Sequence, residues 1–353
     1  MTDILFYGAT GYTGELCAEH AAGRGLSPIL AGRNADRVDR LALRLGLEAR
    51  SFALGDRAAI AAGLTGVSTV LNCAGPFSAT ARPMVEACLA AGVHYVDVTG
   101  EIDVFEALSA RDSEARGRGV ALLPGAGFDV APSDCLAAHV VGRLPGATRL
   151  KLSIGGFGGL GSASRGTAKT MLEAIGDGCR ARRGGRIVTL DAAPPGVADF
   201  GDGPRPTVGV GWGDVSTAYR STGVPDIDVA FEATPPMRRA AAMPGFARRL
   251  VGTALVRGAL NRLIERAMPP GPSEDERLAG QSLIVAEAWD AAGGHAVSRL
   301  IAPEAYRLTA WTAVEIARRV AAGECPTGYQ TPATAFGANF ILSFDDVERI
   351  DVS

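Results

Sequence analysis

Short apolar runs alternate with longer amphipathic stretches in the first third of the chain. Between the runs, segments such as ADRVDRLALRL and ARPMVEACLAAG repeat apolar residues at three- and four-residue spacing, as helices packed on a core do. Strands that alternate with helices of this length predict an α/β fold with a doubly wound parallel sheet. The predicted strands are Ile4–Tyr7, Pro28–Ala31, Arg50–Ala53, Thr69–Cys73, His94–Val98 and Val120–Leu123.

The pattern changes after Pro132, which indicates a second domain of the α+β type. TRLKLSIGGFGG predicts a strand and a glycine-rich turn, and GTAKTMLEAIGDG predicts a helix beginning near Thr167. QSLIVAEAWDAAGGHAVSRLIA predicts two strands joined at Gly293–Gly294. We expect a nucleotide-binding domain over residues 1–130, a substrate domain over 131–330, and a C-terminal segment, 331–353, that packs back on the first domain.

Residues 246–266 mix apolar side chains with arginines, as a basic amphipathic helix does. Such a helix either packs its apolar side on the core or lies on a membrane surface, so peripheral membrane contact stays open. No apolar run reaches the ~18 residues that a membrane-spanning helix needs. The net charge of −3 gives no attraction for nucleic acid.

The six cysteines form no C-x-x-C pair, and the start of the chain, MTDILFYG, lacks the features of a signal peptide. We therefore expect free thiols and a cytoplasmic protein. The four histidines have no metal-ligand spacing, so no metal site is expected. The expected partners are a small-molecule or acyl-thioester substrate and a second copy in a homodimer.

Three glycines form G-x-x-G-x-x-G between the first predicted strand and the first predicted helix. One glycine of such a turn adopts angles that a Cβ forbids, one lets the backbone approach a pyrophosphate, and one lets helix and strand pack closely. A turn that only packs is the alternative, but the strand, helix and alternating domain around it favour a Rossmann-type dinucleotide site. The predicted phosphate-binding residues are Gly8, Thr10, Gly11, Tyr12, Thr13 and Gly14.

The second predicted strand ends in ILAGRN, where an NAD site usually carries Asp or Glu for the ribose hydroxyls. Arg33 and Asn34 stand there instead, and a guanidinium can pair with a 2′-phosphate, unless Arg33 is only a solvated loop residue. NADP(H) is therefore favoured over NAD(H). Asp56, in ALGD after the third strand, either contacts adenine or caps the next helix.

The fourth predicted strand ends in LNCAGPF, at the sheet edge where open α/β sheets bind ligands. Ala74, Gly75 and Pro76 would bring backbone close to the nicotinamide half with little side-chain bulk. Cys73 is interpreted as a small buried residue rather than a nucleophile.

At this point the motifs resemble the saccharopine dehydrogenase-like oxidoreductases, and within them the branch of the trans-acting enoyl reductases. The similarity follows family order along nearly the whole chain. The motifs are GATGYTG, LAGRN, VLNCAGPF, YVDVTGE, GAGFDVAPSD, GSASRGTAKTMLE, GPSEDERLAG and TPATAFG.

The resemblance implies a Rossmann domain that binds NADP(H), with Thr99 and Gly100 along the cofactor cleft and Phe128 toward substrate. One departure argues against saccharopine itself as the substrate: Val130-Ala131 stands in place of the Pro-Gly of the saccharopine-type enzymes. In a second departure, APEAY stands in place of the family's Gly-Asp-Pro-Gly-Tyr, which implies a different substrate or activity if that loop touches substrate.

Hydride transfer also needs a proton source near the acceptor. The candidate catalytic residues are Tyr95, Glu101 and Asp129, with Ser133 or Asp134 expected to cap the helix that follows. A second predicted helix start either binds an anionic part of the substrate or is an ordinary capped helix. Its candidate substrate-binding residues are Ser164, Arg165, Gly166, Thr167 and Lys169.

The leading hypothesis is an NADPH-dependent reductase of a carbon–carbon double bond conjugated to a carbonyl, in lipid or polyketide-like material. A saccharopine- or opine-type dehydrogenase that reduces a C=N bond is the alternative, and it would need arginines around its carboxylated substrate. A non-catalytic protein that binds nucleotide or lipid is the third possibility.

Overall fold

The computed structural model of the protein describes residues 3–156, 164–165, 168, 178–235, 238–239 and 253–352. The chain divides into two compact units. The first holds residues 1–131 and 306–337, and the second holds residues 132–305 and 338–353. The chain therefore passes from the first unit to the second after residue 131, returns to the first for residues 306–337, and ends in the second.

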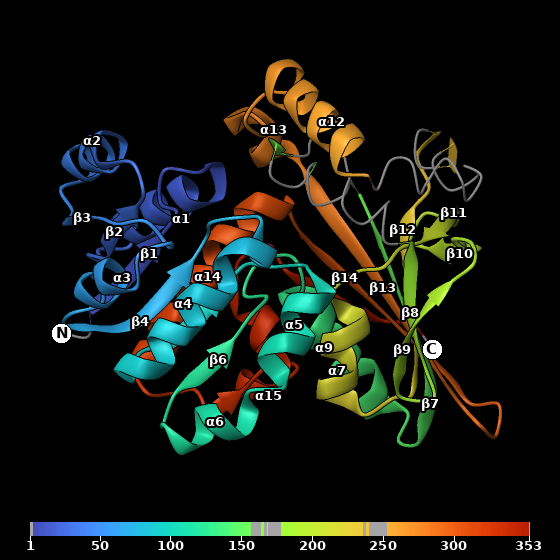
Figure 1. The fold of residues 1–353 in the computed structure, drawn as a ribbon. Coiled ribbons are helices and arrows are strands. Elements are labelled where there is room, and N and C mark those ends of the chain that lie inside the picture. The colour runs from blue at the N-terminus through green and yellow to red at the C-terminus, as the bar shows by residue number, and fades with distance from the viewer. Residues whose placement is uncertain are drawn as a thin grey trace. The chain divides into compact units, whose positions relative to one another are not determined.

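A seven-stranded parallel sheet forms the first unit, in the order β15-β6-β5-β4-β1-β2-β3 (Figure 1). The chain moves outward from β1 to β3, then crosses back to β4 and moves outward on the other side, as in the predicted Rossmann-type fold. The reversal lies between β1 and β4, which pair Tyr7 with Asn72. The strands are β1 (Asp3–Tyr7), β2 (Ile29–Gly32), β3 (Ala49–Ser51), β4 (Val67–Asn72), β5 (His94–Asp97), β6 (Ala121–Leu123) and β15 (Gly328–Tyr329).

Helices connect these strands and pack on the sheet. Helix α1 contacts α2, and α4 contacts both α3 and α5. The helices of this unit are α1 (Tyr12–Gly23), α2 (Ala35–Leu45), α3 (Arg57–Gly63), α4 (Phe77–Ala91), α5 (Ile102–Ser109), α6 (Asp112–Gly117), α14 (Ala305–Ala321) and α15 (Pro332–Phe336).

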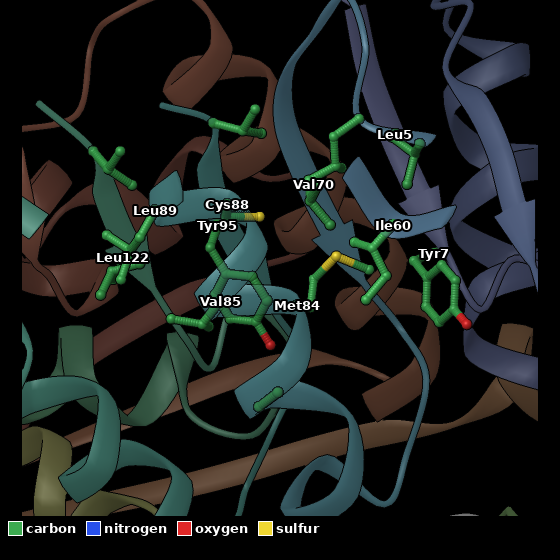
Figure 2. Packing of buried hydrophobic residues seen from close by; sticks show 14 of the residues in the cluster. Leu5, Tyr7, Ile60, Val70, Met84, Val85, Cys88, Leu89, Tyr95 and Leu122 are labelled. Carbon is green, nitrogen blue, oxygen red and sulfur yellow. The ribbon is translucent and has the colours of Figure 1, made fainter. Parts of the chain in front are cut away.

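The core of the first unit lies between the sheet and its helices. Figure 2 shows Val70 and Tyr95 from the strands with Met84 and Val85 from α4, in one cluster of buried side chains. Met84 and Tyr95 have no exposed surface, and a buried side chain of this size contributes about 1.5–3 kcal/mol. This packing fixes where the carboxyl ends of the strands lie.

The second unit is built on a mixed nine-stranded sheet. Strands β7 and β12 pair in parallel, and the other pairs are antiparallel. The predicted hairpin is present, with Asp290 Oδ1 accepting the amides of Ala292 and Gly294 in its turn at 2.9 and 2.7 Å. The strands are β7 (Ala147–Gly155), β8 (Cys179–Arg183), β9 (Arg186–Leu190), β10 (Pro195–Asp199), β11 (Pro204–Gly209), β12 (Asp226–Glu232), β13 (Gln281–Asp290), β14 (His295–Pro303) and β16 (Glu348–Asp351).

The helices of the second unit include part of the basic amphipathic segment. They are α7 (Ala131–Arg143), α9 (Asp214–Thr222), α12 (Ala254–Ala267), α13 (Glu274–Ala279) and the 3-10 helix η2 (Phe340–Ser343). The helix predicted near Thr167 and residues 246–252 lie outside the described residues. In the part of the chain that the structure describes, no helix has the length and apolar character needed to cross a membrane. The predicted homodimer and lipid contact stay predictions.

The last part of the chain, from residue 306 on, differs from the predicted domain division. Residues 306–330, expected in the substrate domain, belong to the first unit, and residues 338–353, expected on the first domain, belong to the second. The reason is that β16 pairs with β14. In addition, Asp351 Oδ1 accepts hydrogen bonds from Ser298 Oγ at 2.7 Å and His139 Nε2 at 2.8 Å.

Candidate functional site

The glycine turn joins β1 to α1 at the point where the sheet order reverses. Gly8 has a φ of +79°, and a Cβ there would lie 2.8 Å from the Ala74 amide nitrogen of the neighbouring strand end. A Cβ on Gly14 would lie 2.3 Å from the Gly8 carbonyl oxygen, so only glycine lets the helix pack this closely. The turn is also closed by the Gly11 amide, which donates to the Gly8 carbonyl at 3.0 Å.

Helix α1 begins directly after this turn with Gly11 as its N-cap, and no side chain caps it. The first amides of such a helix and its positive dipole end suit a pyrophosphate. Thr10, Tyr12 and Thr13 keep part of their surface accessible. The Tyr12 ring packs edge-on against Tyr306 of α14, with ring centroids 5.1 Å apart. A cradle that a Cβ would fill, beside a helix end without a side-chain cap, fits a dinucleotide.

The ends of β2 and β3 carry the residues predicted for the adenosine half. Arg33 is exposed after β2, and Asn34 caps α2 by accepting the Arg37 amide at 3.0 Å. Arg37, which the sequence analysis did not single out, donates from Nη2 to the Thr10 carbonyl at 2.8 Å. Asp56 is an N-cap, because its Oδ1 accepts the amides of Ala58 and Ala59 at 3.0 and 3.1 Å. The cap interpretation of Asp56 therefore has direct support in the contacts.

The loop after β4 is held in place on both sides. Asn72 Oδ1 accepts the Ala74 amide at 3.1 Å, and Thr80 Oγ1 donates to the Ala74 carbonyl. The Gly75–Pro76 peptide is cis. Pro76 is the N-cap of α4 and offers no side-chain acceptor, but Glu101 from the next loop supplies one.

Glu101 accepts the first amides of α4. Its Oε1 accepts the Phe77 amide at 2.8 Å and its Oε2 accepts the Ser78 amide at 2.7 Å. Both carboxylate oxygens are thus engaged with a helix N-terminus, where a negative charge is stabilising. Glu101 therefore links the loop after β5 to the loop after β4, and this position does not fit its predicted role as a proton donor.

Tyr95 belongs to a buried network below these loops. Its hydroxyl donates to Asp97 Oδ2 at 2.8 Å and accepts from Asn72 Nδ2 at 3.1 Å. Burial raises the pKa of Tyr95 well above its usual value, and the side chain has no exposed surface. A phenol so enclosed cannot reach a substrate, so the predicted catalytic role of Tyr95 does not fit its position.

Asp97 is a buried carboxyl in this network that the sequence analysis did not single out. Its Oδ1 accepts the amides of Thr99 and Gly125, each at 3.0 Å, so one carboxylate joins the loops after β5 and β6. Burial raises the pKa of Asp97 to about 7, against the effect of the hydrogen bonds it accepts. The motif YVDVTGE contains the residue, but nothing in its spacing separates Asp97 from an ordinary strand-end aspartate.

Asp129 lies beside this scaffold and keeps part of its surface accessible. A Cβ added to Gly100 would lie 3.2 Å from Asp129 Oδ2, which places the carboxyl directly over the loop after β5. Burial alone raises the pKa of Asp129 to about 7. Among the described residues, none donates a hydrogen bond to this carboxyl. The neighbouring Phe128 amide donates to Thr309 Oγ1 at 2.9 Å, which fixes the backbone at this point.

The remaining predicted residues have other environments. Ser133 and Asp134 lie inside α7, which begins at Ala131, so neither is its N-cap. Ser164 is buried, and Arg165 Nε donates to the Met268 carbonyl at 2.7 Å, at the C-terminal end of α12. Gly166, Thr167 and Lys169 lie outside the described residues.

Cys73 follows β4 and is buried. The hydrogen bond between the thiols of Cys73 and Cys17, together with burial, raises the pKa of Cys73, which agrees with a small buried residue. In the described ranges, no three histidine, cysteine or acidic side chains come together as metal ligands.

The first unit is also similar to known proteins in sequence. Residues 4–123 match the family described as saccharopine dehydrogenase NADP binding domain. Trans-acting enoyl reductases from Mycobacterium tuberculosis and Mycobacterium leprae are 34% and 33% identical to the chain over 140 residues, which is 37% of this chain. The matched part spans 34% of the length of each of these relatives.

The complete fold has a counterpart among solved structures. Apo saccharopine dehydrogenase (L-Glu forming) from Saccharomyces cerevisiae matches with a TM-score of 0.68 over 100% of both chains, at 11% identity. That likeness concerns the fold, whereas the match over residues 4–123 concerns the cofactor. Residues 4–123 therefore form a saccharopine dehydrogenase-type domain that binds NADP(H), and the complete chain has the fold of saccharopine dehydrogenase.

Proposed function

We propose that this protein is an NADPH-dependent reductase of a carbon–carbon double bond conjugated to a carbonyl, in an acyl thioester or other lipid or polyketide-like substrate. The observation that carries the proposal is Asp129, a partly exposed residue at the strand ends whose carboxyl has a pKa of about 7 and accepts no hydrogen bond from the described residues. The relatives named trans-acting enoyl reductases support the same class of reaction.

The residues of the first unit divide the work of binding. Bound NADPH would supply the hydride for the β-carbon of the substrate. The amides at the start of α1 would bind the pyrophosphate, which could approach them because Gly8 and Gly14 have no side chains. Arg33 would pair with the 2′-phosphate. Ala74 and Gly100 would leave room for the nicotinamide half, because neither has a side chain beyond Cβ.

The second hydrogen added to the double bond is a proton, and Asp129 is suited to give it. The protonated carboxyl would deliver its proton to the α-carbon, directly or through one water, and would end the step as a carboxylate. A pKa near neutrality serves both the donation and the later recovery of the proton. Because no described residue forms a hydrogen bond with the Asp129 carboxyl, transfer of its proton would break no such bond in the described part of the fold.

Reduction of a C=N bond in a saccharopine- or opine-type substrate is the second candidate, since the whole chain has the fold of a saccharopine dehydrogenase. Such a substrate carries carboxylates, which bind best to arginines. A guanidinium beside Asp129 would lower its pKa, whereas burial alone accounts for the observed rise. The surroundings of Asp129, as far as they are described, therefore favour the enoyl substrate over a substrate whose carboxylates are bound by arginines beside Asp129.

The test is consumption of NADPH with matched substrates. We expect turnover with a short 2-enoyl thioester and none with its saturated counterpart. Turnover with an imine formed from an amino acid and a 2-oxo acid, but not with the enoyl thioester, would assign the C=N reaction instead. Binding of NADPH without turnover of either substrate would leave a nucleotide-binding protein.

Asp129 is tested in the same assay. We expect Asp129→Asn to lower the rate by about 10²–10⁴-fold while the affinity for NADPH stays the same. The wild-type rate should fall about tenfold per pH unit above pH ~7, because only the protonated carboxyl donates. Asp39→Asn, a change at an exposed residue of α2, is the control and should alter neither quantity. An unchanged rate and pH profile in Asp129→Asn would exclude this role.

A further inference from the structure

We propose that Arg37 is a second residue, beside Arg33, that selects NADPH over NADH by binding the 2′-phosphate of the cofactor. The inference rests on the proposed function only for the position of the adenosine ribose at the end of β2. It does not depend on which double bond is reduced.

The guanidinium of Arg37 is held in place before any ligand arrives. The residue lies in the first turn of α2, and its Nη2 donates to the Thr10 carbonyl at 2.8 Å. Thr10 lies between Gly8 and Gly11 of the turn, so Arg37 reaches back from the second βα unit to the first. An arginine has five N–H donors in a rigid fork, and this bond uses one of them. The remaining donors are already positioned at the edge of the glycine turn.

The charge of Arg37 has no counterion in the part of the chain that the structure describes. A cation in the first turn of a helix is unfavourable, because the helix dipole is positive there. Arg44, in the last turn of the same helix, pairs with Glu15 at 2.6 Å and Glu19 at 2.8 Å. Arg37 forms no such pair within the described ranges, and neither does Arg33. Two arginines that form no ion pair among the described residues therefore lie on either side of Asn34, the N-cap of α2.

This arrangement matches the charge of one particular ligand group. A 2′-phosphate carries close to two negative charges and accepts several hydrogen bonds, and it is the part of NADPH that NADH lacks. One arginine supplies half of the required charge, and two supply all of it. The matched NADP-binding family independently places the dinucleotide in this domain. Arg37 would therefore contribute to the preference between the two cofactors, and not only to the shape of the turn.

The experiment separates a charge role from a shape role by using ligands that differ in the 2′-phosphate. Dissociation constants are measured by titration for NADPH, NADH, adenosine 2′,5′-bisphosphate and AMP. We expect Arg37→Ala to weaken NADPH and the bisphosphate about 10–100-fold, with NADH and AMP changed less than about threefold. Arg37→Lys should lie between, because it keeps the charge and loses the fork. The losses should shrink at high ionic strength.

Arg40→Ala is the matched control. Arg40 is exposed one turn further along α2 and donates to the Asp36 carbonyl, so its removal should change no ligand by more than about twofold. Equal losses for NADPH and NADH in Arg37→Ala would overturn the proposal and assign Arg37 to the shape of the turn. Equal wild-type affinity for the bisphosphate and AMP would also overturn it. Since binding is measured without substrate, failure of the enoyl reduction would leave these results unaffected.

Discussion

Replacing Glu101 should destabilise the first unit rather than remove a catalytic group. The Glu101 carboxylate accepts the amides of Phe77 and Ser78 at 2.8 and 2.7 Å, and α4 has no cap of its own at Pro76. Charge-assisted hydrogen bonds of this kind contribute about 1.5–3 kcal/mol each, and partial exposure places these at the low end. Glu101→Ala removes both and should cost about 2–4 kcal/mol. Glu101→Gln keeps one acceptor oxygen, turns an amide NH₂ toward the second N–H, and should cost about 1–3 kcal/mol.

The assay is hydrogen exchange of the segment that forms α4, because it reports the local opening free energy of that helix. A loss of 2–4 kcal/mol speeds exchange by about 30–1000-fold, since each 1.4 kcal/mol is a factor of ten. Asp39→Asn on α2 is the control and should leave exchange of α4 unchanged. Unchanged exchange in Glu101→Ala together with lost turnover would refute the anchor role and return Glu101 to the chemistry.

Two further predictions concern the glycine turn and the C-terminal strand. Gly14→Ala should weaken NADPH and NADH alike by more than about tenfold in a binding titration, since its Cβ would lie 2.3 Å from the Gly8 carbonyl and displace the start of α1. Gly23→Ala, where a Cβ meets nothing within 4 Å, should bind as the wild type does. Asp351→Asn should destabilise the second unit by about 1–2 kcal/mol in thermal unfolding, because the buried Ser298 hydroxyl loses a charged acceptor. Desolvation raises the pKa of Asp351, but the hydrogen bonds from His139 and Ser298 outweigh it and hold the pKa below its usual value. The stabilisation by the Asp351 carboxylate is therefore present above the unfolded pKa of about 3.9 and is lost as the pH falls below it. The Asp351→Asn variant should lack this pH dependence. Equal loss of stability in acid for both proteins would contradict the assignment.

The sequence is sufficient for the first six strands of the parallel sheet and for the glycine turn, because both follow from local patterns. Six predicted strands correspond to β1 through β6, and each is an apolar run bounded by turn residues. The seventh strand is only Gly328–Tyr329, too short to show any alternation. It forms because the Tyr329 amide donates to Asp112 Oδ1 at 2.7 Å and Gly328 and Tyr329 pair with β6. Contacts of this kind join segments far apart in the chain, and no local pattern records them.

The same limit explains the error at the C-terminus. Residues 338–353 contain a short polar strand, ERID, whose pattern does not indicate which sheet it joins. Its place is decided by pairing with β14 and by the Asp351 contacts with Ser298 and His139. The candidate acids show this as well: their motifs made Tyr95, Glu101 and Asp129 equal candidates for catalysis, and only their hydrogen-bond partners distinguish them.

Three carboxyl groups lie at the end of β5 or in the loops after β5 and β6, and their hydrogen-bond partners distinguish them. The Asp97 carboxylate accepts hydrogen bonds from the Tyr95 hydroxyl and from the amides of Thr99 and Gly125. Its pKa is about 7, but the side chain has no exposed surface and cannot exchange a proton with a substrate. Both carboxylate oxygens of Glu101 accept hydrogen bonds from the first amides of α4. Asp129 has the same raised pKa as Asp97, but the residue keeps part of its surface exposed, and its carboxyl accepts no hydrogen bond from the described residues. A group can act as an acid only if its proton is both available and reachable, and under the proposed function we assign that role to Asp129 among these three.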